Sequence, residues 1–100
     1  RDKFPVTDGH LLVIPKRHAE NYFSLTQDEL LACDGLLRQV RDDLRDKDSS
    51  VEGFNIGMNA GEVAGQTVFH CHIHLIPRRD GDVDDPRGGI RNVILGKRKY

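Results

Sequence analysis

The segment HCHIHLIP, residues 70–77, places a histidine at every second position. Because successive side chains of a β-strand point to opposite faces, this spacing puts His70, His72 and His74 on one face of a strand, which we predict over residues 68–76. The intervening residues are apolar and predict a buried opposite face. A solvated strand face accepts most polar residue types, so the repeated choice of imidazole favours a chemical role.

A long amphipathic helix is predicted between this strand and a short upstream strand in GHLLVIPKRH, residues 9–18, which Pro15 closes. Thr26 is a suitable N-cap, and Glu29 three positions later completes a capping box. Apolar residues then recur at spacings of three and four, which places them on one helical face. These residues are Leu30, Cys33, Leu37, Val40 and Leu44.

A second alternating segment, GFNIGMN at residues 53–59, predicts a half-buried strand that pairs with the histidine strand. Between them, AGEVAGQT at residues 60–67 has the small residues of a loop that can pass close to a ligand. The segment after Pro77 is rich in Gly, Asp and Arg and predicts an extended surface tail. Strands, one long helix and further strands indicate an α+β domain with an antiparallel sheet.

The composition limits the possible function classes. One hundred residues, 37% hydrophobic and 31% charged, predict a single domain over residues 1–100. The formal charge of -1 argues against nucleic acid as the main partner. No apolar run of membrane-spanning length and no signal peptide pattern occurs, and the two cysteines have no metal-binding spacing. We therefore expect reduced thiols, no membrane partner and a cytoplasmic protein.

Three explanations of the histidines differ in the chemistry that they require. The strand face could simply be solvated and rich in histidine. Alternatively, His70, His72 and His74 could bind zinc, although the polar residues nearby are amides and hydroxyls with Glu62 as the one close acid. In the third, a neutral imidazole attacks phosphorus while a backbone carbonyl fixes its tautomer and the flanking histidines donate to phosphate oxygens. The third explanation also accounts for the loop.

Three segments in this order, GHLLVIPKRH, AGQT and HCHIHLI, resemble the histidine triad (HIT) superfamily from Asp2 to about Arg78. The resemblance is nearest to bacterial HIT-family hydrolases and implies a HIT-like fold. It implies attack by His72 on the α-phosphorus of a nucleotide, forming a nucleotidyl-histidine that water or another acceptor resolves. Family members usually have a further strand and helix upstream, so we expect N-terminal elements of the domain to precede Arg1.

The resemblance also implies roles for the residues around His72. His70 would orient the nucleophile through its backbone carbonyl, and His74 and His10 would act on the phosphate side. The remaining implied contacts are Gln66 and Thr67 to the phosphate or leaving group, Asn59 and Gly65 near the ribose and phosphate, and Asp2 to the ribose hydroxyls. His18 is not assigned to the site. The tail arginines Arg78, Arg79, Arg87 and Arg91 either form ion pairs with nearby aspartates or reach a distal phosphate.

The expected activity is hydrolysis or transfer at the α-phosphate of an adenosine nucleotide, either a nucleoside phosphoramidate or a dinucleoside polyphosphate. No cofactor is expected for the covalent step, although Mg²⁺ could accompany a polyphosphate substrate. The family implies a homodimer. The alternative function is a nucleotide-binding or zinc-binding module without catalysis.

Overall fold

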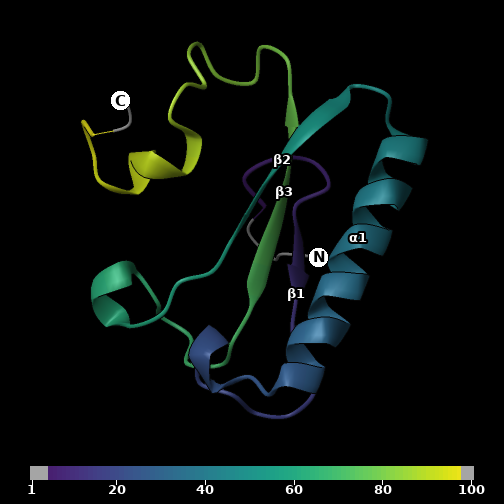
Figure 1. Cartoon of the computed structure of the whole chain (residues 1–100). Coiled ribbons are helices and arrows are strands. Elements are labelled where there is room, and N and C mark those ends of the chain that lie inside the picture. Colours follow the sequence, from purple (N-terminus) through teal and green to yellow (C-terminus); the bar gives the residue numbers. More distant parts are fainter. Residues whose placement is uncertain (1–4, 98–100) are drawn as a thin grey trace.

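The computed structural model describes residues 5–97, so the predicted ribose contact Asp2 lies outside the described residues. A three-stranded antiparallel sheet in the order β1-β3-β2 carries one long helix on one face (Figure 1). The strands and the helix are β1 (Leu11–Val13), α1 (Gln27–Lys47), β2 (Val51–Gly57) and β3 (Ile73–Arg79), with short 3-10 helices η1 (Tyr22–Ser24), η2 (Glu62–Ala64) and η3 (Gly89–Val93). The α+β class and the antiparallel sheet are confirmed. Within residues 5–97, no helix is long and apolar enough to span a bilayer.

The capping box predicted for α1 is present. The hydroxyl of Thr26 accepts from the amide of Glu29 at 3.2 Å, and the Glu29 carboxylate accepts from the amide of Thr26 at 2.8 Å. Arg17 adds a bidentate ion pair to the same carboxylate, with N–O distances of 2.8 and 3.0 Å. Hydrogen bonds from Arg17 and Thr26 lower the pKa of Glu29 to about 2. The start of α1 is therefore fixed to the segment that follows β1.

The hydrophobic core lies between α1 and one face of the sheet. The buried residues of the histidine segment are Cys71, Ile73, Leu75 and Pro77, each no more than 2% exposed. Ile73 packs in one cluster with Val13 and with Cys33 of the helix. Burial raises the pKa of both Cys33 and Cys71, so the thiol form of each is favoured. The apolar face predicted from the alternation is thus the core face.

The boundaries of the histidine strand were predicted wrongly. β3 begins at Ile73, so His70 and His72 precede it, and the strand continues past Pro77 to Arg79. The amide of Cys71 donates to the carbonyl of Ala19, outside the sheet, at 2.7 Å. Proline is tolerated because β1 pairs with β3 only over Ile73–Leu75, so no neighbouring strand requires a donor from Pro77 on that side. Burial nevertheless alternates from His70 to Pro77, as the pattern predicted.

Candidate active site

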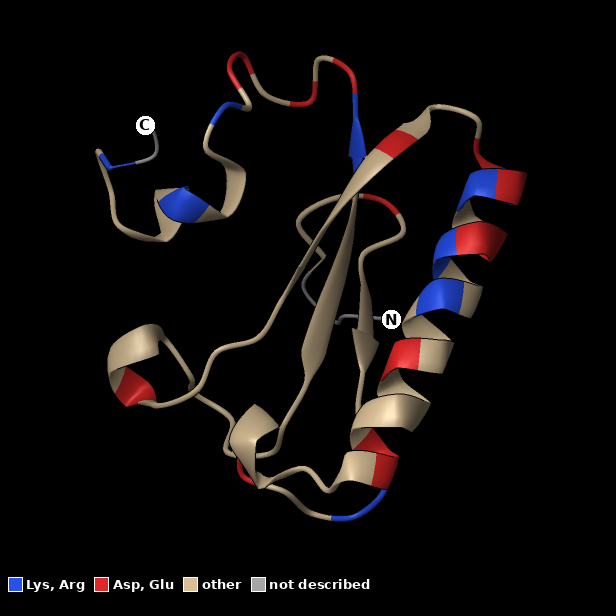
Figure 2. Cartoon of the chain, viewed as in Figure 1, with Lys and Arg blue, Asp and Glu red and all other residues tan. Residues whose placement is uncertain are grey.

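The histidines lie on the face of the sheet opposite α1. His74 is directly opposite Leu12 of β1 and Gly57 of β2, so these three residues share that face. η2 and η3 also lie on this side (Figure 1). Charged residues concentrate on α1 and where the tail begins, whereas the lower half of the sheet carries neither Lys, Arg, Asp nor Glu (Figure 2). The site is therefore built mainly from neutral hydrogen-bonding groups.

His72 is held in the tautomer required of a nucleophile. Its Nδ1 lies 2.9 Å from the backbone carbonyl oxygen of His70. A carbonyl can only accept, so Nδ1 carries the proton and Nε2 retains its lone pair. The ring is half-buried, which leaves it accessible from the side of the sheet opposite the core. The contact on which the predicted orienting role of the His70 carbonyl depends is present, and the role itself stays a prediction.

His10 and His74 form a second pair whose protonation follows from a backbone amide. The amide of Val6 donates to His10 Nδ1 at 3.2 Å, so in neutral His10 the proton is on Nε2. That Nε2 lies 2.8 Å from His74 Nδ1, which must accept, so the proton of neutral His74 is on its Nε2. The rings of His72 and His74 have centroids 5.2 Å apart. A lone-pair nitrogen and an N–H donor are therefore presented by neighbouring rings.

His18 contacts this site, which the sequence pattern does not predict. Its Nδ1 lies 3.1 Å from His70 Nδ1, while His70 Nε2 donates to the carbonyl of Pro15 at 3.1 Å. The side chain of His70 is thus held by the segment after β1, and its backbone carbonyl holds His72. The eight-residue separation of His10 and His18 gave no periodic signal, because Pro15 ends the strand between them.

Gln66, for which a contact with phosphate is predicted, is bonded within the protein. It is 2% exposed; its Oε1 accepts from the amide of Gly61 at 2.8 Å, and its Nε2 donates to the carbonyls of Glu20 at 2.6 Å and Val68 at 3.1 Å. Both amide protons are therefore used within the protein. Gln66 fixes the loop between β2 and the histidines, and this geometry does not support a direct contact with substrate.

The other predicted contacts lie on or beside the same loop. Asn59 and Thr67 are exposed, and Gly65 is an exposed C-cap of η2 with φ of 96°, a conformation that glycine adopts readily. Their contacts with a substrate stay predictions. Of the tail arginines, Arg78 pairs with Asp82, Arg79 with Asp48 and Arg87 with Asp85. These pairs agree with the ion-paired interpretation of the tail.

A family model described as the HIT domain matches residues 1–81. The chain belongs to the HIT family. A bis(5'-nucleosyl)-tetraphosphatase of Schizosaccharomyces pombe is 40% identical over 81 residues, which are 81% of this chain and 44% of that protein. The chain spans about half the length of the first curated HIT-like relatives that it matches.

Solved HIT structures share this fold. A hypothetical histidine triad nucleotide-binding protein from Sulfolobus tokodaii superposes with a TM-score of 0.75 and 41% identity, covering 81% of this chain and 54% of that one. A zinc-bound histidine triad protein from Mycobacterium smegmatis gives a TM-score of 0.74 and 37% identity, covering 81% and 58%. The HIT-like fold predicted from the three motifs is confirmed.

Proposed function

We propose that this HIT protein hydrolyses, or transfers to an acceptor, the nucleotidyl group of an adenosine nucleotide through a covalent bond to His72. The observation that carries the proposal is the 2.9 Å contact of His72 Nδ1 with the His70 carbonyl, which leaves Nε2 as a neutral nucleophile. A tetraphosphatase and a nucleotide-binding protein among the relatives support a nucleotide substrate. The candidate substrates are a nucleoside phosphoramidate and a dinucleoside polyphosphate.

In the first step, His72 Nε2 forms a bond to the α-phosphorus as the bond from phosphorus to the leaving group breaks. An amine leaving group takes up one proton from solvent. In the second step, a water oxygen bonds to phosphorus, the bond to Nε2 breaks, and one proton returns to solvent. The products are AMP and the free leaving group, and His72 is regenerated with its proton on Nδ1.

His74 stabilises the charge that develops on the non-bridging oxygens. Its Nε2–H is a donor because Nδ1 accepts from His10, and His10 is held in the required tautomer by the amide of Val6. His10 therefore acts through His74 as a positioning residue. Asn59, Gly65 and Thr67 are proposed to contact the ribose and phosphates from the loop, and Asp2 the ribose hydroxyls. The covalent step needs no metal, although Mg²⁺ would neutralise a polyphosphate substrate.

We also propose a cytoplasmic homodimer. Among residues 5–97, β2 has a neighbouring strand, β3, on one side only. A groove of about 440 Å³ between β2 and α1 is lined by exposed Leu31 and Ile56. A second copy that pairs along β2 would cover this surface. Cys33 and Cys71 are both free thiols, which agrees with a cytoplasmic location.

An assay of AMP release tests the proposed activity. Purified protein is incubated with adenosine 5'-phosphoramidate and, separately, with a diadenosine polyphosphate, with and without Mg²⁺. We expect AMP from at least one of them, and from the phosphoramidate without added metal. A protein that binds AMP but releases none from either substrate would instead be a nucleotide-binding module.

Binding of a structural zinc ion by His18 and His70 is a second candidate function. The facing Nδ1 atoms of His18 and His70 are 3.1 Å apart, and two ligands of a tetrahedral zinc ion are about 3.4 Å apart. His70 also donates its other N–H to a backbone carbonyl, as zinc-bound histidines do. The described residues contain no group of three metal-binding side chains, so His18 and His70 would supply two of the four ligands. Elemental analysis of the purified protein, compared with a His18→Ala variant, tests this assignment.

A further inference from the structure

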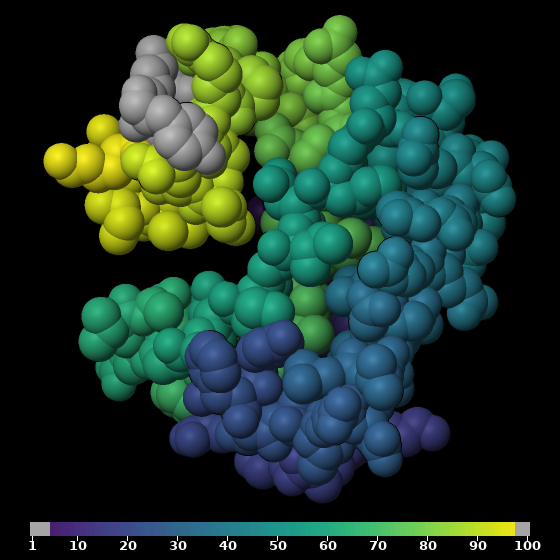
Figure 3. Space-filling view, in the orientation of Figure 1, coloured from purple at the N-terminus to yellow at the C-terminus, as the bar shows by residue number. Residues whose placement is uncertain are grey.

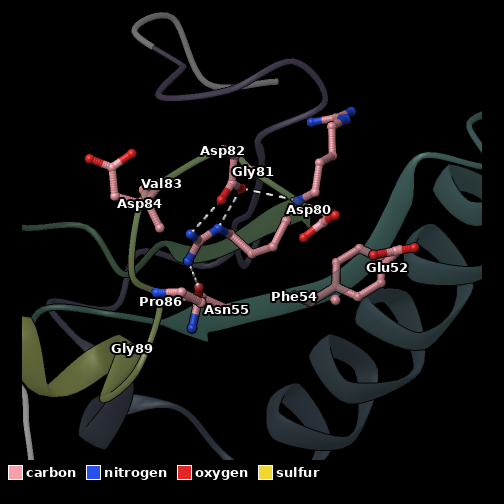
Figure 4. Close-up of a pocket in the computed structure, with 13 residues that line it drawn as sticks. Glu52, Phe54, Asn55, Asp80, Gly81, Asp82, Val83, Asp84, Pro86 and Gly89 are labelled. Atoms are coloured by element: carbon pink, nitrogen blue, oxygen red, sulfur yellow. Dashed lines mark hydrogen bonds and ion pairs between the residues drawn. The ribbon is translucent and has the colours of Figure 1, made fainter.

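The start of the C-terminal tail is fixed to the face of the sheet that carries the histidines. Arg78 of β3 makes two hydrogen bonds to Asp82 at 2.8 and 2.9 Å and a third to the side-chain oxygen of Asn55 on β2 at 2.7 Å (Figure 4). Asp82 also accepts from the amide of Arg79. Both partners of the Arg78–Asp82 pair are about three-quarters buried at their side chains. This network directs the tail across β2.

The tail then reaches the strand position next to the third histidine of the triad. Ile90 of η3 places its Cδ1 3.6 Å from where a Cβ on Gly57 would lie, and Gly57 is the direct partner of His74 across the strand pair. Gly89 lies beside Asn55 in the same way. Ile90 therefore packs over Gly57, which lies one strand spacing, about 5 Å, from His74.

A notch opens between the tail and the loop of residues 60–67 (Figure 3). The tail contributes apolar side chains that are more than half exposed, which is unusual for a short surface helix unless it lines a binding site. These are Ile90, Val93, Ile94 and Leu95. The tail lies outside residues 1–81, which the HIT model matches.

The charges at the start of the tail disfavour an anionic occupant there. A cavity of about 450 Å³ at its start is lined by four carboxylates and two arginines (Figure 4). Both arginines are already paired, Arg78 with Asp82 and Arg79 with Asp48. Glu52, Asp80 and Asp84 make the start of the tail unfavourable for a chain of phosphates, whereas η3 itself carries one cation, Arg91. An apolar, uncharged group is the better match to Ile90.

We propose that η3 forms the leaving-group wall of the active site, and that Ile90 selects nucleoside phosphoramidates whose amine carries an apolar substituent. This inference rests on the proposed function, because it names the side of the α-phosphate from which the leaving group departs. It makes Ile90 a specificity-determining residue, and it makes Arg78 and Asp82 the positioning residues that hold the tail in place.

The test compares two substrates that differ only in the amine, adenosine 5'-phosphoramidate and its N-benzyl derivative. For Ile90→Ala we expect kcat/KM to fall about tenfold with the N-benzyl substrate and to change less than about twofold with the unsubstituted one. Leu95→Ala, a more exposed apolar residue of the same tail, should change neither. Asp82→Ala should reproduce the loss of discrimination by releasing the tail.

Equal losses with both substrates, or no loss with either, would overturn the proposal. A change of oligomeric state in Ile90→Ala, measured by light scattering, together with unchanged discrimination would show η3 to be a subunit interface instead. If wild type hydrolyses neither phosphoramidate but releases AMP from a diadenosine polyphosphate, the proposed function stands and this inference fails. If it releases AMP from none of the three compounds, the proposed function fails. The role of η3 is then tested by calorimetry, which measures the affinity of each protein for the same two compounds. The proposal is supported only if wild type binds the N-benzyl compound more tightly than the unsubstituted one and Ile90→Ala does not.

Discussion

Replacing His72 with alanine is expected to reduce kcat/KM for AMP release by at least about ten-thousand-fold while leaving the thermal midpoint of unfolding near that of wild type. The loss is large because the substitution removes the only atom proposed to bond to phosphorus. The fold should survive because the His72 ring is only half-buried and, within the described part of the chain, its one hydrogen bond is to the His70 carbonyl. Steady-state kinetics and differential scanning calorimetry on the same preparation measure both quantities.

A matched control for this variant is Val68→Ala, in the same segment and 60% exposed. It should retain turnover within about twofold, because it removes only exposed apolar atoms. Near-normal hydrolysis by folded His72→Ala protein would show that another residue, or water directly, attacks the phosphorus.

Replacing Gln66 with leucine is expected to lower the free energy of unfolding by about 2 kcal/mol or more, although leucine has a similar size. Three backbone groups lose their partner in this variant: the Gly61 amide and the carbonyls of Glu20 and Val68. Because these groups connect the loop to the histidine segment, turnover should fall together with stability. Chemical denaturation followed by circular dichroism measures the stability.

Thr67→Val is the comparison for Gln66, since Thr67 is its exposed neighbour in the same motif. Its stability should remain within about 0.5 kcal/mol of wild type. The structural role assigned to Gln66 would be refuted by a Gln66→Leu protein that is as stable as wild type and yet inactive. That result would restore the direct contact with phosphate predicted from the motif.

Sequence patterns predicted the secondary structure well where a contact between neighbouring residues, or the period of a strand, was sufficient to determine it. The pair Thr26 and Glu29 located the start of α1 because the capping box is formed within four residues. The alternation around His72 identified the core face because burial has the strand period even where the strand hydrogen bonds are missing. The start of β3 was predicted wrongly because it depends on the partner strand. β1 has only three residues, and its last residue, Val13, pairs with Ile73.

The unpredicted parts of the site depend on contacts between distant segments. His18 and His70 are 52 residues apart and meet because Cys71 is bonded to the backbone at Ala19. The position of η3 depends on Arg78, which the charge pattern alone could assign either to a neighbouring aspartate or to a substrate phosphate. Motif similarity likewise placed Gln66 in the site, but only its burial and three hydrogen bonds reveal that it holds the loop.

The central claim is that His72 Nε2 becomes bonded to the α-phosphorus during turnover. The most direct measurement is intact-protein and peptide mass spectrometry after the wild-type protein reacts with adenosine 5'-phosphoramidate for less than one turnover and is quenched in alkaline denaturant. We predict added mass of one adenylyl group on the peptide that contains His72, and none in His72→Ala. Turnover without any adduct, or an adduct on a different residue, would contradict the account.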